Sequence, residues 1–113
     1  MRDARSLFTF VEMEPFTKSR VGILSDEELD RVLDELQVNP DAGDIIQGTY
    51  GVRKIRVARG GKGKRGGARV LYYFRDAHEI IYLMYAYAKS QQADVTPEGK
   101  RMLRRMVDEI LGE

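Results

Sequence analysis

Strand and helix patterns alternate in the first part of the chain. Aromatic and β-branched residues fill Ser6–Met13, which predicts a strand that Pro15 ends. A short helical stretch is expected over residues 16–24. Ser25 and Glu28 then form a capping box, and hydrophobic residues recur behind it at helical spacing. A second helix is therefore predicted, with Leu29, Val32, Leu33 and Leu36 on its buried face.

The middle of the chain reads as a loop followed by an antiparallel meander. Residues 40–51 are rich in turn formers and predict a loop. Two strands are expected at residues 51–59 and 68–75, joined by the glycine-rich segment 60–67, and a third strand at residues 79–87. This arrangement predicts a β-hairpin with a long basic tip at the centre of the sheet.

The end of the chain is helical again. Thr96 is suited to cap a helix and Pro97 to occupy its first position, and hydrophobic residues line one face as far as Leu111. The order strand, two helices, three strands, helix predicts an α+β fold. We expect an antiparallel sheet of about four strands, with two N-terminal helices and one C-terminal helix against one face. The 113 residues suffice for a single domain, 1–113, with one modest core.

Composition narrows the setting in which the chain works. It has no cysteine, which excludes disulfides and thiolate metal sites, so a reducing cytoplasm is the expected location. The longest hydrophobic run, Ile80–Ala88, covers nine residues, whereas a membrane span needs about 20. No signal peptide pattern is present at the N-terminus. A soluble protein without a membrane partner is expected.

The net charge of +1 hides a strong segregation of charge. Residues 45–75 contain nine basic residues and no acidic one, while the remainder of the chain carries a net charge of −8. The nine basic residues are Arg53, Lys54, Arg56, Arg59, Lys62, Lys64, Arg65, Arg69 and Arg75. Such a concentration of positive charge is typical of a surface that binds a polyanion, and nucleic acid is the most plausible one.

Strand periodicity assigns these cations to faces. Lys54 and Arg56 share one face of their strand, and Arg53 shares the other with the hydrophobic residues. If the hairpin register brings Arg69 beside Arg56, one lysine and two arginines converge on a phosphate-binding patch. The alternative is the ordinary solvated face of a half-buried sheet, although such faces usually mix charges of both signs.

Tyrosines accompany the basic strands. Tyr73 shares a face with Arg69 and Leu71 on the return strand, and the third strand is expected to place Ile81, Leu83, Tyr85 and Tyr87 on one face. Tyrosines at strand spacing are ordinarily packing residues. Tyr50, Tyr85 and Tyr87 are also candidates for stacking on RNA bases.

Two other patterns carry less information. The hairpin tip matches a dinucleotide-binding fingerprint over residues 61–66, but that fingerprint requires a helix after the strand, and here a strand follows. The tip is expected to be a mobile loop in which Lys62, Lys64 and Arg65 follow a phosphate backbone, or else a merely solvated loop. His78 is the only histidine, so no metal site is expected and a general base would have to be a lysine, a carboxylate or a tyrosine.

Long segments of the chain resemble a known family. The stretch GVRKIRVARGGKGKRGGARVLYYF, the later YAYAKSQQADVTPEG, the SDEEL helix and the NPDAGDIIQGTYG loop resemble the HigB branch of the RelE superfamily, the toxins of type II toxin–antitoxin systems. The resemblance implies a RelE-like microbial RNase fold and a ribosome-dependent mRNA endoribonuclease (mRNA interferase) that cuts translated mRNA in the A site. It also implies attack by the ribose 2′-OH on the adjacent phosphate, without metal or other cofactor. The implied partners are a cognate antitoxin, the ribosome and mRNA, with operator DNA bound only through the antitoxin complex.

The resemblance also carries residue roles. It implies that Lys54, Arg56 and Arg69 are catalytic, and Lys89 stands where the family has a cation near the phosphate. The expected RNA- or ribosome-binding residues are Arg53, Arg59, Lys62, Lys64, Arg65, Tyr85 and Tyr87. Thr96 follows where RelE has a stacking tyrosine, and a threonine is better explained as a helix cap. The alternative function is a non-catalytic or ParE-like toxin that binds DNA gyrase, or a regulatory protein that binds only nucleic acid and antitoxin.

Overall fold

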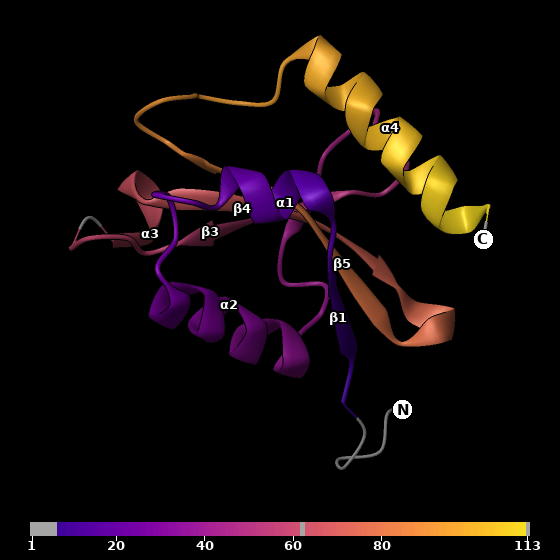
Figure 1. The fold of residues 1–113 in the computed structure, drawn as a ribbon, viewed down its shortest axis with the longest axis horizontal. Helices are drawn as coiled ribbons and strands as arrows, with labels where there is room; N and C mark the ends of the chain where they lie inside the picture. Colours follow the sequence, from indigo (N-terminus) through magenta and orange to yellow (C-terminus); the bar gives the residue numbers. More distant parts are fainter. Residues whose placement is uncertain (1–6, 62, 113) are drawn as a thin grey trace.

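A mixed five-stranded sheet forms the centre of the computed structural model, which describes residues 7–61 and 63–112. The strand order is β1-β5-β4-β3-β2 (Figure 1). The strands are β1 (Thr9–Glu12), β2 (Asp44–Ile45), β3 (Arg53–Val57), β4 (Ala68–Arg75) and β5 (Ile80–Ala88). The hairpin and the third strand of the meander are confirmed. No helix in the described part of the chain is long and hydrophobic enough to cross a membrane.

The two edge strands differ from the prediction. β1 pairs with β5 in parallel, so the sheet is mixed rather than antiparallel. Parallel neighbours need a long crossover connection, and here both early helices and the strands β2, β3 and β4 lie between the two strands in the chain. β2 lies in the segment expected to be a loop. Its two residues are too few to produce an alternating pattern, so the sequence did not predict this strand. β2 pairs with β3 through Asp44–Lys54 and Ile45–Arg53.

Four helices complete the fold with one 3-10 turn. The helices are α1 (Glu14–Ser19), α2 (Asp26–Val38), α3 (Gly63–Gly66) and α4 (Pro97–Leu111), and the 3-10 turn is η1 (Asp76–His78). The predicted helical stretch covered residues 16–24. α1 begins two residues before the start of that stretch and ends five residues before its end. α3 lies in the segment that was expected to be a loop.

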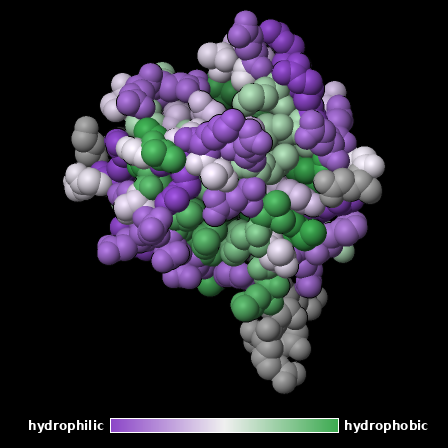
Figure 2. All heavy atoms as spheres, viewed as in Figure 1, coloured by the Kyte–Doolittle hydropathy of each residue, from purple (hydrophilic) through white to green (hydrophobic). Residues whose placement is uncertain are grey.

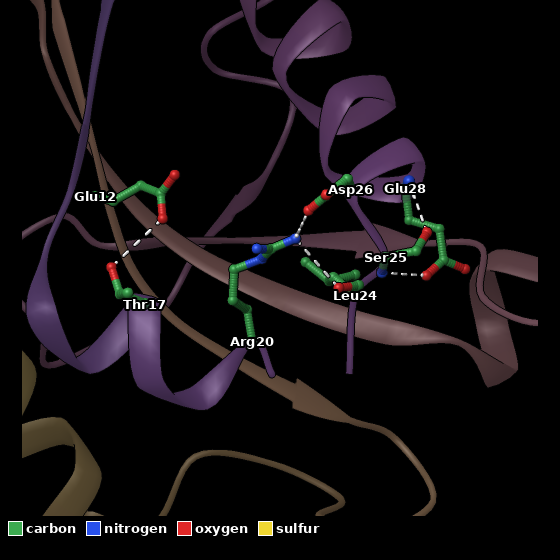
Figure 3. Close-up of polar contacts among 7 residues, drawn as sticks. All are labelled: Glu12, Thr17, Arg20, Leu24, Ser25, Asp26 and Glu28. Carbon is green, nitrogen blue, oxygen red and sulfur yellow. Dashed lines mark hydrogen bonds and ion pairs between the residues drawn. The ribbon is translucent and has the colours of Figure 1, made fainter. Parts of the chain in front are cut away.

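The caps that the sequence predicts are confirmed at α2 and α4. The Ser25 hydroxyl accepts a hydrogen bond from the Glu28 N–H at 3.1 Å, and the Glu28 carboxylate accepts one from the Ser25 N–H at 2.9 Å (Figure 3). The same close-up shows Arg20 donating to the Asp26 carboxylate at 2.8 Å, which ties α1 to the start of α2. The Thr96 hydroxyl accepts from the Gly99 N–H at 3.0 Å. Both helix starts are therefore fixed by local side chains.

Hydrophobic cores lie on both faces of the sheet, so the prediction that all helices cover one face is wrong. α2 lies on one side of the sheet and α4 on the other (Figure 1). Leu29, Val32 and Leu36 of α2 pack with Val70 and Tyr72 of β4. On the opposite face, residues of α4 pack against the sheet; the members of this second cluster are Ile46, Val52, Leu71, Met84, Tyr87, Leu103, Met106 and Val107. The central strands are hydrophobic on both faces, so their sequences do not alternate and do not indicate which face each helix covers.

A β-bulge in β5 corrects a second prediction about faces. Leu71 pairs with Tyr85, but the next residue of β4, Tyr72, pairs with Leu83, which leaves Met84 as an additional residue. A bulge of this kind reverses which side chains point to which face. Leu83 therefore packs on the α2 side, whereas Tyr85 and Tyr87 lie on the α4 side. The four predicted face-mates on β5 are divided between the two cores.

Polar side chains cover most of the outer surface seen in Figure 2, and hydrophobic side chains reach it only in separate patches. The described residues with large exposed hydrophobic side chains are Leu7, Val21, Val38, Ile45, Tyr50 and Leu111. They come from different elements, and single exposed hydrophobic residues are normal on a soluble surface.

Candidate functional site

A row of three side chains crosses the middle of the sheet on the α4 face. Arg56 of β3 pairs directly with Arg69 of β4, and Arg69 pairs directly with Tyr87 of β5. Side chains of direct antiparallel partners lie on the same face, about 4.5–5.5 Å apart at Cβ. The register on which the predicted phosphate-binding patch depended is therefore confirmed.

A second row lies one step along the same face. Lys54 pairs with Leu71, and Leu71 pairs with Tyr85. Because residues two apart on a strand share a face, Lys54 lies beside Arg56 and Tyr85 beside Tyr87. We call the set Lys54, Arg56, Arg69, Tyr85 and Tyr87 the basic face.

Arg69 is the most deeply buried cation of this face. Its exposed fraction is 5%, and its Nη1 donates to the Ala68 carbonyl at 3.2 Å. Arg56, its partner across the strand pair, is exposed. Withdrawing a guanidinium from water is costly, and a second guanidinium on the neighbouring strand adds repulsion.

The loop after β5 brings an acid to the basic face. The Lys54 Nζ lies 3.3 Å from an Asp94 carboxylate oxygen, and the same oxygen accepts a hydrogen bond from the Val95 N–H at 2.8 Å. That backbone hydrogen bond lowers the pKa of Asp94, with further lowering by Lys54 and Lys100. Asp94 could not be predicted from the sequence, because it lies forty residues from Lys54 and belongs to no periodic pattern.

Tyr87 lies under this loop. It is buried at 4% exposure and packs in the second hydrophobic cluster. Burial raises the pKa of Tyr87, the Asp94 carboxylate raises it further, and the Arg69 guanidinium opposes both effects. With 4% of its surface exposed, the ring of Tyr87 has no open face on which a base could stack.

Tyr85 lines a cavity at the start of α4. The cavity has a volume of about 270 Å³. Its walls are Leu71, Tyr85, Gln92, Val95, Thr96, Gly99, Met102 and Leu103. A largely hydrophobic hollow with one aromatic wall, beside a cationic strand pair, is suited to hold a nucleobase.

Lys89 follows β5 at the edge of this region. Its N–H donates to the Gly67 carbonyl at 3.0 Å, which joins the end of β5 to the start of β4. Its exposed side chain donates from Nζ to the Ala93 carbonyl at 3.1 Å. In this conformation the Lys89 amine stabilises the loop that carries Asp94.

Arg53 and Arg59 lie away from the basic face, on the side of the sheet covered by α2. Arg53 Nη1 donates to the Gly43 carbonyl at 2.8 Å and to the Asp41 carbonyl at 3.2 Å. Arg59 donates from Nε to the Ile23 carbonyl at 2.8 Å and from Nη2 to the Gly22 carbonyl at 3.1 Å. Both guanidiniums therefore hold loops in place, a role that composition alone does not distinguish from RNA binding.

The hairpin tip contains a short helix where a mobile loop was expected. Lys64 and Arg65 belong to α3, and Lys62 lies outside the described residues. The Gly60 N–H donates to the Glu28 carboxylate at 3.2 Å, which attaches the tip to α2.

His78 is exposed in η1. No group of three histidine, cysteine, aspartate or glutamate side chains in the described ranges could hold a metal ion.

Comparison with known proteins identifies the family. The model of the family described as RelE toxin of the RelE/RelB toxin–antitoxin system matches residues 12–112. The chain belongs to the RelE toxin family. This membership confirms the RelE resemblance and the α+β fold class expected from the sequence. The basic face is thus a surface of a toxin of this family.

Solved structures of RelE toxins share the fold. A mutant of the Escherichia coli toxin RelE in the free state has a TM-score of 0.56 and 18% identity, covering 78% of this chain and 90% of that one. A RelBE toxin–antitoxin complex from Mycobacterium tuberculosis has a TM-score of 0.54 and 17% identity, covering 82% and 100%. The intact E. coli RelBE complex has a TM-score of 0.54 and 20% identity, covering 72% and 95%.

Proposed function

We propose that this RelE-family toxin is a ribosome-dependent mRNA endoribonuclease of the HigB branch, which cleaves translated mRNA in the ribosomal A site. The observation that carries the proposal is the pairing of exposed Arg56 with buried Arg69, beside Lys54, on one rigid strand pair. Three cations on adjacent strands form a site for a phosphodiester.

The proposed reaction begins with attack of a ribose 2′-oxygen on the adjacent phosphorus. The bond from phosphorus to the 5′-oxygen of the next nucleotide then breaks, which leaves a cyclic phosphate. The proton of the 2′-hydroxyl passes to water, and the departing 5′-oxygen takes up a proton from water. Negative charge on the phosphate oxygens increases in the transition state, and planar arginine forks stabilise such charge without reorganising. Arg56 and Arg69 supply these forks, and the protein's own cations serve in place of a metal ion.

Lys54 is the third cation at the phosphate. Its contact with Asp94 joins side chains that are 28% and 71% exposed, and exposed ion pairs contribute little free energy. An incoming phosphate can therefore replace the carboxylate at the lysine amine. Lys89, two residues after Tyr87, adds positive charge at the entrance when its amine leaves the Ala93 carbonyl.

The partners follow from the same proposal. The cations of the hairpin tip, Lys62, Lys64 and Arg65, contact ribosomal RNA, while the basic face acts on mRNA. The cognate antitoxin restrains the toxin in the cytoplasm, and operator DNA is bound only through their complex. Structures of RelBE toxin–antitoxin complexes among the fold neighbours support the antitoxin as partner.

Mapping of mRNA 5′ ends in cells tests this function. The toxin is induced without antitoxin, and primer extension is carried out with and without a block to translation. We expect cuts confined to translated regions that disappear when translation stops. Growth arrest with intact mRNA would contradict the proposal and favour a ParE-like action on gyrase.

A further inference from the structure

One buried hydroxyl on the basic face has no hydrogen-bond partner. The Tyr87 hydroxyl is buried, and no partner for it exists within the described part of the chain. Buried polar groups in folded proteins are nearly always hydrogen-bonded, and leaving one without a partner costs about 1–3 kcal/mol. This tyrosine therefore needs an explanation that packing does not supply.

Tyr72 shows what a satisfied buried tyrosine looks like in the same sheet. Its hydroxyl donates to the Pro40 carbonyl at 2.8 Å and accepts from the Gly43 N–H at 2.9 Å. Tyr72 lies on the α2 face and holds the loop before β2. Tyr87 lies on the α4 face, where its direct neighbour is Arg69.

Charged side chains of both signs lie near the Tyr87 hydroxyl. Arg69 and Asp94 both act on it electrostatically, and Asp94 is the residue that contacts Lys54. The hydroxyl therefore faces the charged part of the basic face. A ligand oxygen placed between Arg69 and Lys54 would meet this hydroxyl as a third donor.

We propose that the Tyr87 hydroxyl donates a hydrogen bond to a non-bridging oxygen of the scissile phosphate, next to the guanidinium of Arg69. This inference rests on the proposed endoribonuclease function and adds a neutral donor to its cations. Tyr87 then contacts the substrate through its hydroxyl, whereas the sequence suggested stacking through its ring.

The protonation state of Tyr87 suits a donor. Burial and the nearby Asp94 raise its pKa, so the hydroxyl keeps its proton at neutral and mildly alkaline pH. A hydrogen bond from a neutral donor to an anionic oxygen is short and strong, and it involves no proton transfer. A phosphate that replaces the exposed Asp94 carboxylate at Lys54 would lie on the side of the hydroxyl from which Asp94 now acts.

Tyr87→Phe isolates the hydroxyl, because it keeps the ring in the core. The assay is single-turnover cleavage of mRNA on programmed ribosomes, with thermal unfolding measured in parallel. We expect cleavage to fall about 100-fold or more, as for the loss of one preorganised donor, while the melting temperature stays the same or rises.

Two substitutions serve as controls. Tyr82→Phe changes a tyrosine of the same strand, also buried at 5% exposure, that pairs with Tyr73 toward the opposite end of β5. It should leave cleavage unchanged. Tyr72→Phe removes a hydroxyl with two partners and should lower the melting temperature.

Each outcome is decisive. If wild-type toxin cuts mRNA and Tyr87→Phe cuts it equally fast, the hydroxyl does not bind substrate. If Tyr87→Phe lowers the melting temperature as much as Tyr72→Phe, the hydroxyl has a structural partner and the inference is wrong. If the wild-type toxin cuts nothing on ribosomes, the proposed function itself fails, and the inference fails with it.

Discussion

Arg56 and Arg69 are direct cross-strand partners, one exposed and one almost completely buried. Like charges placed opposite each other destabilise a strand pair, and burial of one guanidinium adds a desolvation cost. On the same face, Leu71 and Tyr87 pack in the second hydrophobic cluster beside the two arginines. The pair concentrates positive charge at one point of the basic face, as the proposed phosphate site requires.

Removal of the exposed Arg56 side chain should affect cleavage strongly and the stability of the fold very little. We expect Arg56→Ala to reduce cleavage on ribosomes at least about 100-fold, because the variant loses a donor to the transition-state charge. The unfolding free energy should change by less than about 0.5 kcal/mol, since the side chain is exposed and its removal relieves repulsion. Arg105→Ala, an exposed arginine on α4, is the charge-matched control. If Arg56→Ala kept full cleavage activity and unfolded in urea like the wild type, the reaction would take place at another site.

The Asp94 carboxylate contacts the Lys54 amine, which the proposed site uses to bind the phosphate. We expect Asp94→Asn to increase RNA affinity about two- to fivefold, because it removes a competing carboxylate worth no more than an exposed ion pair. The measurement is binding of a 2′-deoxy mRNA analogue on ribosomes at several salt concentrations. Glu98→Gln, in the first turn of α4, controls for the general loss of a negative charge. Weaker binding of Asp94→Asn, but not of Glu98→Gln, would make Asp94 a substrate-binding residue.

The capping box makes the fold sensitive to acid. Hydrogen bonds from the Ser25 N–H and then the Gly60 N–H lower the pKa of Glu28 below its ordinary value of 4.5. A lowered carboxyl pKa contributes stability that is present above the ordinary value and is lost as pH falls through the folded-state pKa. Thermal unfolding from pH 7 to pH 3 should therefore show a steeper loss for the wild type than for Glu28→Gln. Glu27→Gln, one residue earlier on the same turn, is the matched control; an equal change in both variants would assign the effect to charge alone.

Arg59 should matter for stability more than for RNA. Its guanidinium holds the Gly22 and Ile23 carbonyls, so Arg59→Ala should cost about 1–2 kcal/mol of unfolding free energy. Arg59→Lys retains the charge but not the two-pronged geometry, and it should be destabilised nearly as much. Chemical denaturation and ribosome binding are measured on both variants. Unchanged stability with weakened ribosome binding in Arg59→Ala would restore the RNA-binding role that the sequence suggested.

The sequence predicted the centre of the site because the site depends on local rules. Strand alternation placed Lys54 and Arg56 on one face. The approach of Arg69 was conditional on the hairpin register, and the structure shows the register that pairs Arg56 with Arg69. The α2 and α4 caps were equally predictable, since each involves residues three apart.

What the sequence missed depends on long-range packing. The parallel pairing of β1 with β5 and the placement of α4 opposite α2 are decided by tertiary contacts of strands that are hydrophobic on both faces. The bulge at Met84 leaves no sign in the pattern, yet it decides that Tyr85 and Tyr87 join the basic face. Asp94 reaches Lys54 only because the loop after β5 folds back.

The assignment of the nuclease site to the arginine pair is tested by comparing cleavage by wild-type toxin and by Arg69→Ala, on programmed ribosomes and on the same mRNA free in solution. We predict that the wild type cuts within the A-site codon on ribosomes and leaves free mRNA intact, and that folded Arg69→Ala cuts neither. Cleavage of free mRNA at the same rate, or undiminished cleavage by Arg69→Ala, would contradict the assignment of a ribosome-dependent nuclease site to this arginine pair.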